Sequence, residues 1–197
     1  MITPDAPGGR VMEVAAAAAR GGADVIQLRH KSMPRGELLA LARRLRAALS
    51  KVLFVVNDHV DIALLSEADG VHLGPEDLSV TSARRVAGDR LLIGASASSL
   101  ERAREAIAGG ADYLGCGPAF ATPIKSGKKV IGPSGIAAIA NAVDVPVFSI
   151  GGIDASNVAQ LTKLGLNRAC VIRAVGEAPN PEQAARELRA MLSATDR

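Results

Sequence analysis

The sequence predicts a closed (β/α)8 barrel, the TIM-barrel architecture, formed by a single domain over residues 1–197. Short apolar runs of strand length alternate strictly with Ala- and Leu-rich stretches of helical period, as repeated β/α units require. The joints from helix to strand also recur, as GGADVIQL, EADGVHLG, GGADYLGC and LGLNRACVI. Hydrophobic residues make up 48% of the chain but aromatic residues only 2%, which suits close packing of helices on a sheet. An open doubly wound sheet is disfavoured because no GxGxxG motif follows the first strand.

This alternation gives eight strands and eight helices in order. Apolar runs bounded by Gly, Asp or Pro predict strands at residues 2–3, 25–28, 53–56, 70–73, 91–94, 113–115, 147–150 and 169–172. Apolar residues recurring every three to four positions predict helices at residues 11–20, 35–50, 61–67, 79–86, 100–108, 134–142, 156–164 and 181–193. The first strand is a stub, and most connecting loops must be short because the chain has only 197 residues.

The composition limits the partners of the chain. The net charge is +3, basic residues are spread rather than clustered, and there is no Trp and one Tyr, so nucleic-acid binding is not expected. Anionic small molecules stay plausible ligands, and the strand ends narrow them to small-molecule phosphates and diphosphates. The longest apolar runs are strand-sized and no signal peptide is recognisable, so neither a membrane span nor export is expected and the location should be cytoplasmic. Cys170 falls in the predicted strand at 169–172 and Cys116 directly follows the one at 113–115, so both should be buried thiols. Nothing excludes a homodimer.

Polar groups follow the strand at 25–28. Gln27, Arg29 and Lys31 share one face by alternation, so an amide and two cations would point together at the barrel mouth. A forked guanidinium and a point charge suit a diphosphate. The alternative is a polar rim that holds neighbouring loops.

Carboxylates follow the next two strands. Asn57 and Asp58 end the strand at 53–56, and Asp77 follows the strand at 70–73. Two carboxylates from adjacent strand ends are a hard-oxygen site that suits Mg²⁺ shared with substrate phosphates. Asp77 could instead cap the following helix, and Glu76 is a substitute ligand.

Further candidates follow the later strands. Ser96 could donate to substrate or cap a helix, and Thr122 and Lys125 lie in a long loop that is typical of a lid. Gly151 and Gly152 would expose backbone N–H groups at a phosphate site, a common feature of this end of a barrel. Arg173, at the end of the last predicted strand, would add a positive charge there, or form a surface salt bridge.

Hydrolase and zinc chemistry are disfavoured. His30, His59 and His72 show no metal-ligand spacing such as HExxH, and there is no GxSxG motif.

Five blocks in order, QLRHK, VVNDHVDIAL, ADGVHLGPEDL, GADYLGCGPAFATPIK and PVFSIGGI, resemble the thiamine-phosphate synthase family, from about the first strand to the last helix. The resemblance implies a transferase that joins hydroxymethylpyrimidine diphosphate to thiazole phosphate and releases pyrophosphate. It implies that Gln27, Arg29, Lys31 and Asn57 bind the pyrimidine diphosphate, that Asp58 and Asp77 bind Mg²⁺, and that Ser96 lies beside the pyrimidine. Thr122 and Lys125 would contact thiazole and diphosphate, and Gly152 would hold the thiazole phosphate, with Arg29, Lys31 and Lys125 as the catalytic cations.

The chain departs from the family pattern at three positions. Ile124 replaces a threonine, Ser98 a histidine and Arg173 a frequent serine. Two alternatives stay open: an isomerase like the related thiazole tautomerase, and a catalytically silent phosphate-binding regulator. The tautomerase relies on a histidine where this chain has Ser98, which disfavours the isomerase.

Overall fold

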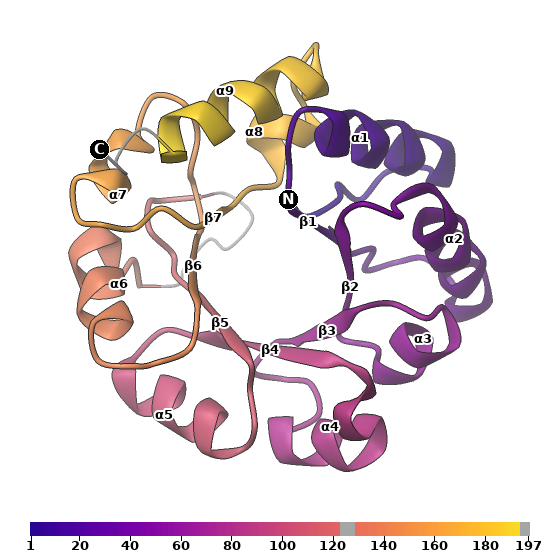
Figure 1. Cartoon of the computed structure of the whole chain (residues 1–197), viewed down its shortest axis with the longest axis horizontal. Helices are drawn as coiled ribbons and strands as arrows, with labels where there is room; N and C mark the ends of the chain where they lie inside the picture. The colour runs from indigo at the N-terminus through magenta and orange to yellow at the C-terminus, as the bar shows by residue number, and fades with distance from the viewer. Residues whose placement is uncertain (123–128, 194–197) are drawn as a thin grey trace.

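The computed structural model describes residues 1–122 and 129–193, which form a ring of parallel strands surrounded by helices (Figure 1). The strands are β1 Val25–Leu28, β2 Leu53–Asn57, β3 Gly70–Leu73, β4 Leu92–Ala97, β5 Tyr113–Cys116, β6 Val147–Ile150 and β7 Ala169–Cys170. The helices are α1 Gly8–Arg20, α2 Arg35–Ala48, α3 Val60–Leu65, α4 Val80–Ala87, η1 Gly88–Arg90, α5 Leu100–Ala108, α6 Gly132–Ala140, α7 Ala159–Thr162, α8 Arg173–Gly176 and α9 Pro181–Ser193.

The sheet is parallel throughout, and its strands follow the chain order from β1 to β7. The N-terminal segment joins its two edges. Ile2 forms a parallel bridge with Gln27 of β1, and the Ile2 N–H donates to the carbonyl oxygen of Val171, just after β7, at 2.9 Å. The predicted barrel is therefore closed, and Figure 1 shows the N-terminus between β1 and β7.

Each strand has one face against the surrounding helices and one face toward the interior of the ring. Ile26, Phe54 and Ile93 are fully buried and alternate with residues that line the interior of the ring, such as Gln27 and His72. Alternate residues of a strand point to opposite faces, so the outer set packs under the helices. Burying each such side chain contributes roughly 1.5–3 kcal/mol.

Two glycines make room for rings inside the barrel. A Cβ on Gly94 would lie 2.0 Å from Cζ of Tyr113, and one on Gly115 would lie 3.0 Å from Cε1 of His72. The rings of Tyr113 and His72 are 5.6 Å apart and tilted by 34°. With so few aromatic residues, the barrel thus uses two of its rings to fill the space that small residues leave.

Three predicted elements differ from those observed by more than a shift of their ends. The stub at 2–3 is a single bridge rather than a strand, because its backbone divides its bonds between β1 and the segment after β7. The last strand ends at Cys170, and Arg173 begins the short helix α8 instead of ending a strand. The predicted helix at 156–164 is α-helical only at Ala159–Thr162.

The remaining sequence expectations concern the cysteines and the membrane. Cys116 is buried as predicted, whereas Cys170 is only half-buried because it lines a pocket. In the part of the chain that the structure describes, no helix combines the length and the apolar character that crossing a bilayer requires.

Candidate active site

A pair of carboxylates lies where β2 and β3 end. Asp58 has a left-handed backbone with φ 65°, a conformation that Asp and Asn tolerate better than most residues. Its N–H donates to the carbonyl oxygen of His72 at 2.8 Å, and its side chain is in hydrogen-bonding contact with Asp77. Asp77 Oδ2 in turn accepts from the N–H of Gly74 at 2.7 Å. The two predicted metal ligands therefore face one another.

The electrostatics of Asp58 show which charges surround it. The pKa of Asp58 is raised to about 7, mainly by burial and then by the hydrogen bond and negative charge of Asp77. The positive charges of Arg29 and Lys31 act in the opposite direction. All four charged groups are thus close enough to interact, which is the convergence that the sequence predicts for them.

Asp77 does not cap the following helix. The N-cap of α4 is Ser79, whose Oγ accepts from the N–H of Ser82 at 3.1 Å. The carboxylate of Asp77 is held by the Gly74 amide and turned toward Asp58, so the capping alternative is wrong. Glu76, the substitute ligand, is exposed.

The residues expected to bind a diphosphate differ in exposure. The Arg29 side chain is only 15% exposed, whereas Lys31 is exposed at the mouth of the barrel. Gln27 points inward and lines a largely apolar interior cavity of about 380 Å³. Its Oε1 is buried without a hydrogen-bond partner among the described residues. A buried acceptor without a partner costs free energy unless a ligand or water satisfies it.

Ser96 lies within β4 and is paired with a residue to which the sequence assigned no role. His72 Nε2 lies 3.0 Å from Ser96 Oγ. The N-cap of α5 is Ser99, whose side chain accepts a hydrogen bond from the N–H of Arg102. Ser96 therefore does not cap this helix. Alternation along 70–73 places His72 inward, and this signal could have identified it beforehand.

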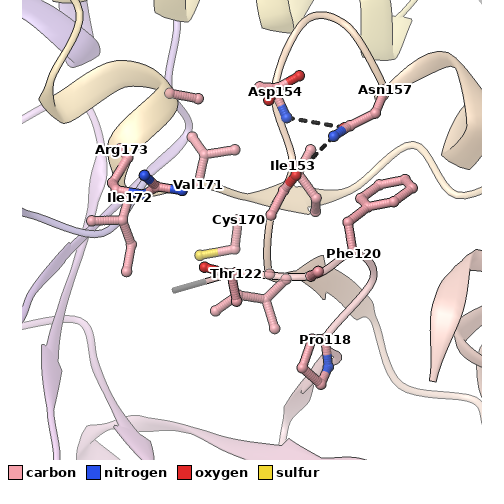
Figure 2. Close-up of a pocket in the computed structure, with 15 residues that line it drawn as sticks. Pro118, Phe120, Thr122, Ile153, Asp154, Asn157, Cys170, Val171, Ile172 and Arg173 are labelled. Atoms are coloured by element: carbon pink, nitrogen blue, oxygen red, sulfur yellow. Dashed lines mark hydrogen bonds between the residues drawn. The ribbon is translucent and has the colours of Figure 1, made fainter. Parts of the chain in front are cut away.

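A second part of the mouth is a pocket of about 570 Å³ between the segments that follow β5, β6 and β7. Figure 2 shows the lining residues from the three segments: Pro118, Phe120 and Thr122; Ile153, Asp154 and Asn157; and Cys170 to Arg173, with Thr122 close to Cys170. Gly151 and Gly152 also line it, with φ of 102° and 65°. The two glycines therefore line a pocket at the end of β6, and phosphate binding by their N–H groups stays a prediction.

The two glycines serve packing as well as access. A Cβ on Gly152 would lie 2.6 Å from the carbonyl oxygen of Ala121, and one on Gly151 would lie 2.9 Å from Pro118. The turn after β6 therefore presses directly on the segment after β5, and only glycine fits both the space and the backbone angle.

Asn157 fixes this turn and was not identified from the sequence. Its Nδ2 donates to the carbonyl oxygen of Gly152 at 2.7 Å, and its Oδ1 accepts from the N–H of Asp154 at 3.0 Å (Figure 2). The predicted helix begins at Ser156, but the N–H and hydroxyl of Ser156 donate to Asp154 Oδ1 and close a turn instead. The short spacing from Gly152 to Asn157 is the only sequence signal for this contact.

Arg173 lies at the pocket as the first residue of α8. Its side chain is exposed and forms no salt bridge within residues 1–122 and 129–193, so the surface salt bridge is not seen in that part of the chain. Lys125 and Ile124 lie outside the described residues, as does most of the loop predicted to form a lid.

The carboxylate pair fits a divalent cation. Two carboxylates in contact repel one another, and a hard dication relieves that repulsion with the oxygen ligands it prefers. No group of three or more His, Cys, Asp or Glu side chains in the described ranges could hold a metal by itself. A metal ion held by Asp58 and Asp77 would therefore need further ligands other than these His, Cys, Asp and Glu side chains.

The fold is a TIM barrel, and its strand ends carry a glycine-lined pocket on one side and cations beside paired carboxylates on the other. These features define the class of TIM barrels that act on phosphorylated substrates. The family model described as thiamine monophosphate synthase matches residues 1–175. The chain belongs to this family.

Individual relatives agree with this result. The chain is 42% identical to the thiamine-phosphate synthase of Moorella thermoacetica, with 98% of this chain and 94% of that protein covered. The chain is also 42% identical to the thiamine-phosphate synthase of Thermosynechococcus vestitus, and 95% of this chain is covered by the match. The chain spans only 54%, about half, of the length of that relative. The solved thiamine phosphate pyrophosphorylase of Pyrococcus furiosus superposes with a TM-score of 0.91 at 39% identity, covering 100% of this chain and 95% of that one.

Proposed function

We propose that the chain joins hydroxymethylpyrimidine diphosphate to thiazole phosphate, forming thiamine phosphate and pyrophosphate, with Mg²⁺ as cofactor. The observation that supports this most is the interaction of Asp58 with Asp77, Arg29 and Lys31 at one point of the barrel mouth. A site that only held a phosphate would have no use for two carboxylates beside two cations. A diphosphate with its metal ion needs both.

The first half of the reaction breaks the bond between the pyrimidine methylene carbon and a diphosphate oxygen. Arg29 and Lys31, together with Lys125, neutralise the charge that develops on the departing oxygen. Mg²⁺, held by Asp58 and Asp77, supplies Lewis-acid stabilisation of that charge when bound. Gln27, Asn57 and Ser96 orient the pyrimidine, and the unpaired Oε1 of Gln27 is an acceptor for a ring substituent. No general base is required.

The second half forms a bond from the thiazole nitrogen to the same carbon. The pocket bounded by Gly151, Gly152, Thr122 and Arg173 takes the thiazole phosphate. Holding that phosphate places the ring nitrogen beside the carbon that loses its leaving group, and such positioning removes a large entropic part of the barrier. The cytoplasmic location and the homodimer expected from the sequence stay predictions.

The test is pyrophosphate release by the purified 197-residue chain with both substrates. Release should require Mg²⁺, stop with chelator, and fall by at least about 100-fold in Asp77→Asn, since one metal ligand and its charge are lost. Asp24→Asn is the matched control, because Asp24 is an exposed aspartate that pairs with Arg189 before β1, at the opposite end of the barrel. No release by the wild-type chain would reject the proposal.

A further inference from the structure

The N-terminal segment reaches the diphosphate side of the mouth through Asp5. Asp5 Oδ2 accepts from Nη1 of Arg29 at 3.2 Å, and Asp5 Oδ1 accepts from the backbone N–H of Lys31 at 2.9 Å. One carboxylate thus contacts both residues of the cation pair, one through its side chain and the other through its backbone. We propose that Asp5 is a positioning residue, which fixes Arg29 and the Lys31 backbone for diphosphate binding; this inference rests on the proposed function.

The segment that carries Asp5 is held on both sides. The N–H of Arg29 donates to Thr3 Oγ1 at 3.0 Å, and the Thr3 hydroxyl donates to the carbonyl oxygen of Arg29 at 3.2 Å. Thr3 is fully buried, and the next residue, Pro4, packs against Gly176 of α8. Asp5 therefore projects from a fixed backbone, as a positioning residue requires.

The geometry leaves Arg29 able to bind an anion. A guanidinium has five N–H donors, and Asp5 accepts from Nη1. The contact restrains the guanidinium, and within residues 1–122 and 129–193 Nη2 and Nε donate to no other acceptor, so they can donate to a phosphate. Ordering this long side chain before substrate arrives reduces the entropy that binding must otherwise remove.

An ordinary surface ion pair would look different. The Arg29 side chain is 15% exposed and that of Asp5 44%, so the guanidinium is largely withdrawn from solvent. The second bond of Asp5 goes to a backbone amide, which holds the position of Lys31 but adds nothing to charge pairing. A purely electrostatic role also predicts the opposite effect, because removing a carboxylate beside a cation pair should strengthen the binding of anions.

The test compares Asp5→Ala, Asp5→Asn and Asp5→Glu with Asp24→Ala, which removes the same charge from an exposed ion pair at the other end of the barrel. Calorimetry measures binding of inorganic pyrophosphate with Mg²⁺, and steady-state kinetics measures KM and kcat for the pyrimidine diphosphate. Asp5→Ala should weaken pyrophosphate binding and raise KM by about tenfold, with kcat within about threefold, since the lost binding is uniform.

Asp5→Asn should lie between Asp5→Ala and wild type, because its amide oxygen can still accept from the Lys31 N–H. Asp5→Glu should restore part of the affinity, and Asp24→Ala should change nothing. Should Asp5→Ala fail to fold, Asp5→Asn, which is isosteric, carries the comparison.

The inference is overturned if Asp5→Ala or Asp5→Asn binds magnesium pyrophosphate as tightly as wild type, or more tightly. If wild type binds it with the expected dependence on Asp5 but releases no pyrophosphate from the two substrates, the proposed function fails and the role of Asp5 in anion binding stands. If wild type does not bind it at all, the role of Asp5 is overturned, and the pyrophosphate-release assay alone decides the proposed function.

Discussion

Replacing Asp58 should separate the stability of the fold from its function. With Mg²⁺ removed by chelator, Asp58→Asn is expected to stabilise the protein, because it removes a half-buried negative charge in contact with Asp77. The left-handed φ of 65° at this position suits Asn as well as Asp, so the substitution adds no backbone strain. The same change should abolish turnover, since it removes one of the two proposed metal ligands.

The pH dependence of folding stability shows whether the Asp58 carboxylate stabilises or destabilises the fold. The pKa of Asp58 is about 7 in the folded protein against its usual 3.8, so the folded chain binds the proton more tightly than the unfolded chain. The contribution of Asp58 to stability is therefore complete below about pH 3.8 and is lost as the pH rises through 7. The stabilisation by Asp58→Asn should accordingly be larger at pH 8 than at pH 5.

The magnitude follows from the same two pKa values. A change from 3.8 to about 7 corresponds to an upper limit of ~4 kcal/mol. Asp58 is only half-buried, so solvent screening reduces this to about 1 kcal/mol. For a chain of this size, that is a rise in Tm of roughly 2–4 °C.

Thermal unfolding followed by circular dichroism measures this change with chelator at pH 5 and pH 8, and again with Mg²⁺. Asp24→Asn serves as the control that removes a charge elsewhere. In wild type, Mg²⁺ should raise Tm, and in Asp58→Asn this rise should be lost. A lower Tm for Asp58→Asn in chelator at pH 8, or a gain no larger than at pH 5, would refute the reasoning.

Two further changes test the pocket on the other side of the mouth. Gly152→Ala should destabilise the fold by at least ~2 kcal/mol in denaturant unfolding. The new Cβ would lie 2.6 Å from the Ala121 carbonyl oxygen, and the backbone φ of 65° at residue 152 disfavours alanine. A stability equal to wild type would contradict this close packing of the two turns. Arg173→Ser should raise KM for thiazole phosphate by about tenfold, because one charged contact to phosphate is lost, and should leave KM for the pyrimidine diphosphate unchanged. Equal increases in the two KM values would mean that Arg173 acts on the whole site.

Much of the barrel could be predicted from local pattern alone. The strands from 25–28 to 147–150 were found because each is a short apolar run between polar turns, and parallel strands buried on both faces have this signature. The ends of the chain were less predictable. The role of Ile2 depends on Val171, far away in sequence, and two residues carry too little periodicity to reveal such a partner.

The same contrast holds for the site. Asp58, Asp77, Arg29 and Lys31 could be grouped beforehand because carboxyl ends of parallel strands meet at one rim. Asn157 and Asp5 could not, since Asn157 bonds to backbone groups of its own turn and Asp5 to the backbone N–H of Lys31, and a backbone group leaves no trace in the identity of a residue.

The sequence by itself determined the order of the units, the layer in which each strand residue lies, and the charges that arrive at the mouth, because these depend on spacing along the chain. Only the tertiary structure decided how the ring closes, how the carboxylates pair, and which residue holds Arg29. Those features depend on contacts between segments up to about 170 residues apart, as from Ile2 to Val171, and their geometry is set by packing rather than by local preference.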